Sequence, residues 1–351
     1  MTELIEVSGA EPLWPTTATR LWTTALRQSV DDHRLSTKNH PLGDLLGDRL
    51  DLARPPFITS GVRAVIPTLA SLQRRVVVET PTFADVPRLF RRHGCEVELG
   101  PLDQVVRRSE PAGRHLIWLT SPGRNPDGAE VTPALADALA RFQADGGLVV
   151  QNETYRWYCR DAVRIPGAIA VGSLGKLAGS WCRLGWLAGE LPTPLAADLP
   201  FQGPPAFWQS AFARLIQNGG LDLLVHAARE VGSLTRQVAA TIRGDGKLAW
   251  SGDGPSLLVR IAACTDPVEV LRAELGLVAN PGPAFHAAAD AVRLCFTGRT
   301  AADVDWERIR AIGTRLGGIV VEPGQASYPA GDTLDPGHHV QVTDVVVPKG
   351  P

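Results

Sequence analysis

The stretch Gly-Ser-Leu-Gly-Lys-Leu-Ala-Gly-Ser-Trp-Cys-Arg-Leu-Gly-Trp, residues 172–186, contains one of only four lysines in the chain. The protein takes nearly all of its positive charge from arginine, so a lysine at position 176 indicates a specific chemical need. An arginine guanidinium stays protonated, whereas a lysine amine can become neutral and condense with an aldehyde. We therefore interpret Lys176 as a covalent attachment point for a carbonyl compound, against the alternative of a solvated lysine in a Gly/Ser loop.

The composition points to a small-molecule partner. The formal net charge is −2 with both signs spread along the 351 residues, which offers no footprint for nucleic acid or an anionic membrane. The five cysteines are odd in number and form no Cys-x-x-Cys pair, so we expect no disulfide framework and no metal site. An acidic N-terminus and the lack of a long apolar run predict neither export nor a membrane anchor. We therefore expect a cytoplasmic protein.

From about residue 55, short β-branched runs alternate with amphipathic stretches, which is typical of a mostly parallel sheet covered by helices. The clearest helix begins at Pro133 behind a Thr132 N-cap and ends before Gly146. Ligands of such sheets bind beyond the carboxyl ends of the strands. The expected strands are 75–80, 95–99, 115–121, 148–151 and 168–172, and a helix is expected over 84–93.

The texture changes after about residue 230, where a long helical stretch leads to apolar strands at 256–261 and 291–296 and a helix at 304–316. We predict a large domain over 45–230 and a small α/β domain from 1–44 and 231–324. A Gly/Pro-rich C-terminal extension, 325–351, follows. It carries His338 and His339, for which a solvated or packing role is favoured over metal binding.

The lysine stretch resembles the cofactor-binding segment of fold-type I pyridoxal-phosphate enzymes, the class I/II aminotransferase family. The resemblance runs from about residue 35 to 320, and histidinol-phosphate aminotransferases and threonine-phosphate decarboxylases are the members nearest in length. It implies an α/β fold with a mostly parallel central sheet covered by helices, plus a smaller C-terminal α/β domain. It also implies pyridoxal 5′-phosphate bound to Lys176 and a homodimer with its active site near the interface.

Two loops resemble the family's contacts to the phenolic oxygen of the cofactor. Residues 121–128, Ser-Pro-Gly-Arg-Asn-Pro-Asp-Gly, follow a predicted strand and present Asn125. Residues 151–155, Gln-Asn-Glu-Thr-Tyr, end the next strand and present Tyr155. By this resemblance, the Asn125 amide and the Tyr155 hydroxyl share the phenolic oxygen.

The second loop departs from the family at the residue expected beside the ring nitrogen, because Asn152 replaces an aspartate. A carboxylate there stabilises the protonated ring as an electron acceptor, and a neutral amide does so less well. Two explanations stay open: a reaction that needs a weaker electron acceptor, or Glu153 in the aspartate's role. The first is favoured, since adjacent side chains of a strand face opposite ways.

The remaining cofactor contacts follow the same resemblance. Backbone N–H groups at Gly61 and Val62, the Ser173 hydroxyl and the Arg183 guanidinium are expected to bind the phosphate. Phe83 is expected to stack on the ring, with a role in the core as the alternative. Two departures suggest a rearranged phosphate site: Gly175 replaces a serine, and seven residues rather than eight separate the lysine from the arginine.

The substrate side rests on the stretch Asn-Pro-Gly-Pro-Ala-Phe, residues 280–285, and on Arg293 in the strand after it. The resemblance implies that Arg293 binds the substrate α-carboxylate, which suits a planar guanidinium; an arginine on an exposed strand face is the alternative. The family's tyrosine from the partner subunit is absent near residue 38, where Lys38 or His40 are candidates. Trp14, Trp157 and Trp181 are candidates for an apolar pocket or for core packing.

The resemblance thus predicts an enzyme that acts on the Cα of an amino acid. We favour an aminotransferase. A lyase that decarboxylates, eliminates or cyclises its substrate is the first alternative, which the Asn152 replacement motivates. A non-catalytic binding member of the fold is the second.

Overall fold

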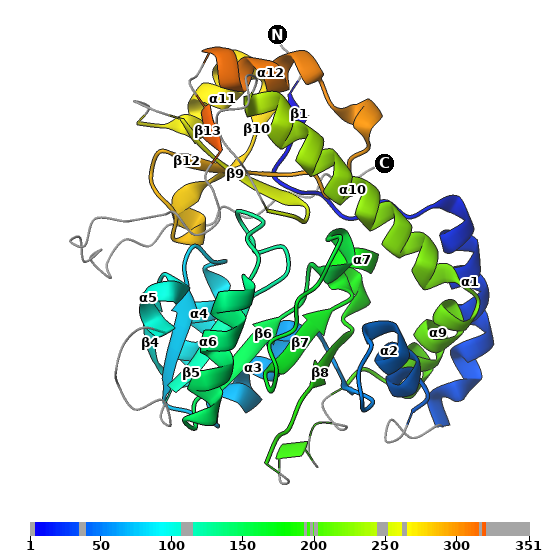
Figure 1. The fold of residues 1–351 in the computed structure, drawn as a ribbon. Coiled ribbons are helices and arrows are strands. Elements are labelled where there is room, and N and C mark those ends of the chain that lie inside the picture. The colour runs from blue at the N-terminus through cyan, green and yellow to red at the C-terminus, as the bar shows by residue number, and fades with distance from the viewer. Residues whose placement is uncertain are drawn as a thin grey trace.

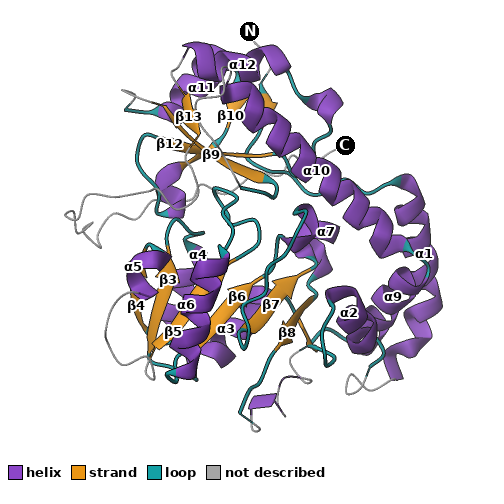
Figure 2. Ribbon diagram, viewed as in Figure 1, coloured by secondary structure: helices purple, strands orange, loops and turns teal. Residues whose placement is uncertain are grey.

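The computed structural model describes residues 4–34, 40–106, 115–192, 195–196, 199, 203–243, 252–261, 265–315 and 318–320. Two sheets lie one above the other in Figure 1, and a long helix, α10 (Gly220–Arg243), runs along one side between them. Figure 2 shows the helices gathered around the larger, lower sheet and above the upper one. No helix in the described ranges is long and apolar enough to cross a membrane.

The larger sheet has the strand order β2-β8-β7-β6-β5-β3-β4 among the described residues. Strands β4, β3, β5, β6 and β7 are parallel, and β8 and β2 are antiparallel to their neighbours. This order confirms the expected mostly parallel central sheet. The bounds are β2 Phe57–Thr59, β3 Arg75–Glu79, β4 Glu96–Gly100, β5 His115–Thr120, β6 Leu148–Asn152, β7 Ile169–Ser173 and β8 Gly185–Ala188.

Helices cover both faces of this sheet because alternate strand residues are apolar on both sides. On one face, Val78 and Trp118 pack with residues of α3 (Val62–Ala70) and α4 (Asp85–Arg92). On the other face, Val77 and Ile117 pack with α6 (Pro133–Ala144) and with Leu102 of α5 (Leu102–Val106). The predicted cap of α6 is present, since the Thr132 hydroxyl accepts a hydrogen bond from the Leu135 N–H at 3.3 Å.

The smaller sheet has the order β11-β12-β9-β13 and is antiparallel throughout the described chain. Its strands are β9 Ser256–Ile261, β11 Asn280–Pro281, β12 Ala291–Cys295 and β13 Gly318–Val320. Helices α10, α11 (Pro267–Leu275) and α12 (Trp306–Arg315) bury an apolar core against it, with Val259 and Val292 at 0% exposure. The predicted strands at 256–261 and 291–296 and the helix at 304–316 are therefore confirmed.

The N-terminal segment first forms a separate two-stranded sheet beside the smaller sheet and then crosses to the helices next to the larger one (Figure 1). Strand β1 (Ile5–Glu6) pairs in parallel with β10 (Leu277–Val278), and Ser8 forms a bridge with Cys295. Helix α1 (Thr16–Ser29) then packs on α9 (Ala206–Gln217), beside α2 (Leu42–Leu50). The chain thus passes close to the short helix α7 (Gly175–Ala178), which carries Lys176.

Candidate active site

A cavity of about 420 Å³ opens beyond the carboxyl ends of β5, β6 and β7. This is the place where an open α/β sheet binds ligands. The ten residues that the sequence nominates for the lysine attachment, the cofactor contacts and the substrate carboxylate all lie on the wall of this cavity. These residues are Gly61, Val62, Phe83, Asn125, Asn152, Tyr155, Ser173, Lys176, Arg183 and Arg293.

Lys176 lies on α7, directly after β7, because the strand ends at Ser173 and the chain turns there into a single helical turn. The Lys176 carbonyl accepts a hydrogen bond from the buried Tyr158 hydroxyl, which fixes the backbone of the lysine. Its side chain is exposed to the cavity. The lysine is therefore positioned by its main chain, while its amine stays free to react.

Tyr155 and Asn125 bring hydrogen-bond donors to the same space. Tyr155 follows β6, is 7% exposed, and its hydroxyl has no hydrogen-bond partner among the described residues. The Asn125 Oδ1 accepts a hydrogen bond from Arg293 Nη1 at 3.1 Å, so the amide NH₂ is the part of Asn125 left to donate. Both side chains can thus donate to an anionic oxygen in the cavity.

Arg293 reaches the cavity from β12 of the smaller sheet. Besides Asn125, its guanidinium donates to the Ser8 carbonyl and the Asn280 Oδ1, and it lies 4.7 Å from the Phe285 ring centroid. These contacts fix the plane of the guanidinium. Its Nε is buried without a hydrogen-bond partner in the described chain. An arginine held in this way can bind a carboxylate with defined geometry.

Asn152 is the last residue of β6 and is 8% exposed. Its Oδ1 accepts from the Thr154 N–H at 3.2 Å and from the Thr154 hydroxyl at 2.6 Å. Its Nδ2 donates to the Thr120 hydroxyl at 3.3 Å. A backbone N–H can only donate, so this network fixes which amide atom is the oxygen. The Asn152 oxygen is fully used, and one N–H of its amide remains to be donated.

Glu153 does not line the cavity and is fully buried. Its carboxylate pairs with Arg156 at 2.5 Å and with Arg164 at 2.8 Å. These two arginines neutralise the Glu153 carboxylate away from the cavity. The structure therefore favours Asn152, and not Glu153, as the residue that faces a bound ring.

One end of the cavity is rich in donors. Gly61 precedes helix α3 with φ of +98°, a conformation that suits glycine, and it exposes the first N–H groups of the helix. The Ser173 hydroxyl lies 3.6 Å from the position of a Cβ at Gly61. Arg183, in the left-handed conformation, has no hydrogen-bond partner in the described chain. This combination of backbone N–H, hydroxyl and guanidinium suits a phosphate.

Phe83 stands at the cavity rim, 40% exposed, with the Arg63 guanidinium 5.9 Å from its ring centroid. Its exposure excludes the alternative of a buried core phenylalanine. An exposed ring at the mouth of a cavity is available to stack on a planar ligand.

The tryptophans do not wall this cavity. Trp14 and Trp181, with 5.7 Å between their ring centroids, belong to an aromatic cluster with Trp22 of α1 and Trp208 of α9. Trp157 packs against Trp186. His40 is buried and bonded within its own chain to Ser210 at 3.0 Å. Lys38, His338, His339 and the extension 325–351 lie outside the described residues.

Sequence reasoning missed the residues that support the nominated ones. Thr120 and Thr154 orient Asn152, and Tyr158 holds the backbone of Lys176. Glu11 and Ser180 line the space next to Lys176. The Asn-x-Thr pattern of residues 152–154 is a local signal for an Asx-type turn and is visible in the sequence, whereas Glu11 comes from a segment far away along the chain.

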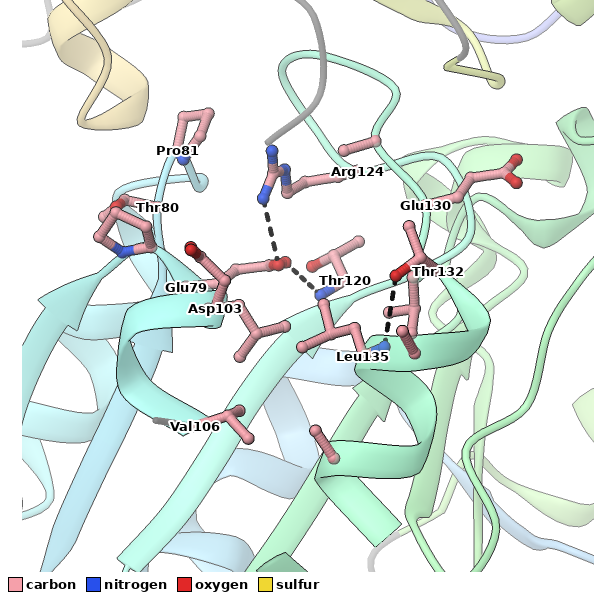
Figure 3. A pocket seen from close by; sticks show the side chains of 16 residues that line it. Glu79, Thr80, Pro81, Asp103, Val106, Thr120, Arg124, Glu130, Thr132 and Leu135 are labelled. Carbon is pink, nitrogen blue, oxygen red and sulfur yellow. Dashed lines mark hydrogen bonds and ion pairs between the residues drawn. The ribbon is translucent and has the colours of Figure 1, made fainter. Parts of the chain in front are cut away.

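A second cavity of about 340 Å³ adjoins the site behind Thr120 (Figure 3). As Figure 3 shows, the Glu79 carboxylate points between the Thr120 N–H and the Arg124 guanidinium. Arg124 Nη1 lies 3.4 Å from Glu79 Oε2. Burial raises the pKa of Glu79 to about 7, and the positive charge of Arg124 opposes that shift. Arg124 is held in turn by Asp127, with Nε to Oδ1 at 2.8 Å.

We expect the Glu79 carboxyl to make the protein less stable as the pH rises. Its folded pKa lies above the ordinary value of 4.5, so its stabilising contribution is complete below that value and is lost as the pH rises through about 7. Glutamine cannot ionise, so Glu79→Gln should remove this pH dependence of the free energy of unfolding. The loss that it removes is at most about 3 kcal/mol between pH 4.5 and 8. Urea unfolding of both proteins at several pH values measures it, and equal slopes would contradict the assignment.

Among the described residues, one group of three side chains has the spacing of a possible metal site. Glu130, Cys159 and Asp253 have ligand atoms within 4.8 Å of one another. Asp253, however, already pairs with Arg236 and accepts a hydrogen bond from the Arg160 N–H at 2.7 Å. Burial raises the pKa of the Cys159 thiol well above its usual value, which disfavours the thiolate that metals bind.

Comparison of the sequence with known proteins finds matches over about half of the chain. Residues 47–218 match the family model described as aminotransferase class I and II. A threonine-phosphate decarboxylase of Sinorhizobium sp. is 27% identical over 187 residues, which are 51% of this chain and 53% of that protein. The match therefore spans about half the length of that curated relative.

Solved structures match over nearly the whole chain. A kynurenine aminotransferase of Pyrococcus horikoshii, in a complex with PMP, is 18% identical and covers 90% of this chain and 91% of its own, with a TM-score of 0.72. An α-aminoadipate aminotransferase of Thermus thermophilus, complexed with N-(5′-phosphopyridoxyl)-L-leucine, is 19% identical with the same coverage and a TM-score of 0.69. These likenesses confirm the expected fold.

Residues 47–218 of the chain belong to the aminotransferase class I and II family, and the fold is that of the fold-type I pyridoxal-phosphate enzymes. Those two solved structures contain ligands derived from pyridoxal phosphate. The cavity fits this group, because a donor-rich end suits its phosphate, a lysine stands within the same wall, and Tyr155 and Asn125 can donate to its phenolic oxygen.

Proposed function

We propose that this protein is a pyridoxal-phosphate-dependent enzyme that acts on the Cα of an amino acid, and that it is an aminotransferase. The observation that carries this proposal is the single cavity in which Lys176 faces Tyr155, Arg183 and Arg293. When bound, pyridoxal phosphate supplies an aldehyde that condenses with amines and a ring that accepts electrons from the bonds at Cα.

The residues of the chain have distinct proposed roles in this reaction. Lys176 would hold the cofactor, and its amine would move the Cα proton as general base and then acid. Arg293 binds the substrate carboxylate and so sets the orientation of Cα. Gly61, Val62, Ser173 and Arg183 bind the phosphate.

Three more residues are proposed to contact the ring. The Tyr155 hydroxyl and the Asn125 amide donate to the phenolic oxygen, and Phe83 stacks on one face. Asn125 therefore contacts the cofactor and Arg293 at once, because its NH₂ group donates to the cofactor and its Oδ1 accepts from Arg293.

The experiment that tests the proposal is incubation of the purified protein with pyridoxal phosphate, a panel of amino acids and an α-keto acid. An aminotransferase consumes the keto acid and forms the corresponding new amino acid. Release of carbon dioxide or ammonia without keto-acid consumption would replace it with the lyase alternative. A protein that takes up no cofactor would point to the non-catalytic alternative.

A lyase is kept as a second candidate because of the Asn152 network. The Asn152 amide has an N–H left to donate and no free acceptor, so it favours an unprotonated ring nitrogen. Such a ring accepts less charge from Cα, which disfavours reactions that depend on a long-lived carbanion. The resemblance to a threonine-phosphate decarboxylase over half its length also supports this candidate.

Asn152→Asp is expected to give a protonated ring nitrogen and about tenfold or more faster removal of the Cα proton, because the carboxylate stabilises the positive ring. The ¹⁵N chemical shift of labelled cofactor in the two proteins reports the protonation directly. Exchange of the Cα hydrogen with deuterium oxide reports the rate. An identical nitrogen shift in both proteins would contradict the role of residue 152.

The organisation of the chain is also proposed. We propose a large domain over 45–230, a small domain from 1–44 and 231–324, and a C-terminal extension over 325–351. The pairing of β1 with β10 supports the assignment of the first residues, whereas the packing of α1 on α9 links the rest of the N-terminal part to the large domain.

We further propose a homodimer located in the cytoplasm. The family resemblance supports the dimer, with the active site near the interface. The cysteines at 95, 159, 182 and 295 are buried and free, which is compatible with a reducing compartment. Light scattering at several protein concentrations would test the dimer.

A further inference from the structure

A small pocket of about 90 Å³ adjoins the main cavity, and residues 8–12 of the N-terminal segment form part of its wall. It shares Lys176, Tyr155 and Arg293 with the cavity, so under the proposed function it is the space next to the Cα of the amino-acid substrate. A substrate side chain can enter it. The volume corresponds to about three water-sized groups, which limits that side chain to a short one.

The N-terminal segment is fixed over this pocket at both ends. On the smaller sheet, the Ala10 N–H donates to the Thr297 carbonyl at 3.0 Å. On the other side, the Trp14 indole donates to the Ala178 carbonyl at 3.0 Å. The positions of the side chains between these two contacts are therefore defined by the fold.

Glu11 is the acidic side chain of this pocket. Its Oε2 accepts a hydrogen bond from the Ser180 N–H at 2.8 Å. The carboxylate packs closely against Gly179, where a Cβ would lie 3.0 Å from Oε2. Glu11 forms no ion pair within the described residues, so its negative charge is not compensated by a side chain and its Oε1 has no partner there.

The rest of the pocket wall accepts hydrogen bonds and offers no further cation in the described chain. Ser8, Ser180 and Thr297, each of which carries a hydroxyl, line it beside Glu11. The two cations on the wall, Lys176 and Arg293, have roles in the proposed reaction, and Arg293 is already bound to three acceptors. An ammonium group has three donors and a positive charge, which this set of acceptors matches.

We propose that Glu11 is a specificity-determining residue that selects amino acids with a short, amine-bearing side chain, such as 2,4-diaminobutyrate. This inference rests on the proposed function, because it assigns the substrate of the same site. The carboxylate of Glu11 pairs with the side-chain ammonium, and the neighbouring hydroxyls accept its other N–H groups. An acidic side chain is repelled by the same carboxylate.

The test uses the full-length protein loaded with pyridoxal phosphate and follows the cofactor absorbance while an amino acid is added. L-2,4-diaminobutyrate, L-norvaline and L-aspartate have similar length and differ in side-chain charge. The native protein should be half-saturated by diaminobutyrate at a concentration roughly tenfold or more below that for norvaline, and aspartate should be weakest. This order needs no variant, so it does not depend on how a mutant folds.

Glu11→Gln then tests the residue itself, because an amide oxygen can still accept from the Ser180 N–H while the charge is lost. We expect half-saturation by diaminobutyrate to rise about tenfold or more and that by norvaline to stay within about twofold. Glu190→Gln, at an exposed position after β8 and outside the pocket, is the matched control and should change neither.

The outcomes separate the two proposals. A protein with normal cofactor absorbance that binds diaminobutyrate no better than norvaline overturns the assignment of Glu11 alone. Equal weakening of all three amino acids in Glu11→Gln does the same, since it would mean a structural role for the N-terminal segment. A protein that binds no cofactor overturns the proposed function and this inference with it.

Discussion

Lys176→Ala is expected to abolish turnover and to remove the absorbance of covalently bound cofactor. The alanine side chain has no amine to condense with the aldehyde, and none to transfer the Cα proton, a step worth about 10²- to 10⁴-fold in rate. Lys176 faces the cavity with its backbone held by Tyr158, so the substitution removes the reactive group while the turn that carries it remains. Absorption spectra and assays with a panel of amino acids measure both effects.

Two further variants make this test specific. Lys176→Arg keeps a positive side chain but cannot form the covalent bond, so it should fail in the same way if chemistry matters. Lys349→Ala removes a lysine far along the chain from the motif and should leave both the spectrum and the turnover unchanged. Retention of the absorbance in Lys176→Ala would assign the cofactor to a different residue.

The sheet and most of the cavity wall could be predicted because their signals are local. β-Branched runs mark β3, β5 and β6, whose alternate residues are buried on two faces. In a parallel sheet, the residues directly after each strand meet at one edge, so Asn152 and Ser173 come together once their strands are recognised.

The contacts that orient these residues could not be predicted, because they depend on tertiary structure. Thr120 meets Asn152 through the pairing of β5 with β6, and Thr120 lies 32 positions away along the chain. Glu11 meets Ser180 across 169 positions, through a segment whose path follows from β1 and α1. The two-residue strand β1 is too short to produce a periodic pattern.

The role of the buried His40 ring could not be predicted from the sequence either. Its position near the N-terminal part made it a candidate for a contact with the partner subunit, but its ring bonds to Ser210 and to the Leu42 N–H at 3.2 Å. Burial lowers its pKa, which keeps the ring neutral inside the fold. A histidine in a sequence does not reveal whether its ring serves a site or satisfies the backbone around it.

Arg293→Lys is expected to reduce kcat/KM for every amino acid by about 10²- to 10³-fold while the protein still binds its cofactor. A lysine keeps the charge, but it has no planar pair of N–H groups and cannot replace the guanidinium that donates to Asn125, Ser8 and Asn280. The loss should be independent of the substrate side chain, since the carboxylate is common to all amino acids.

The decisive comparison is with an amine that lacks a carboxylate. If Arg293 binds the α-carboxylate, the half-saturating concentration of such an amine, followed by cofactor absorbance, should be nearly the same in Arg293→Lys and in the native protein. If the arginine instead only joins the smaller sheet to the Asn125 loop, both kinds of ligand should weaken equally, because the loop itself would shift. Asn280→Ala removes one of its protein acceptors without touching the substrate, so a small and uniform effect there would support the carboxylate role, since the guanidinium keeps two other anchors.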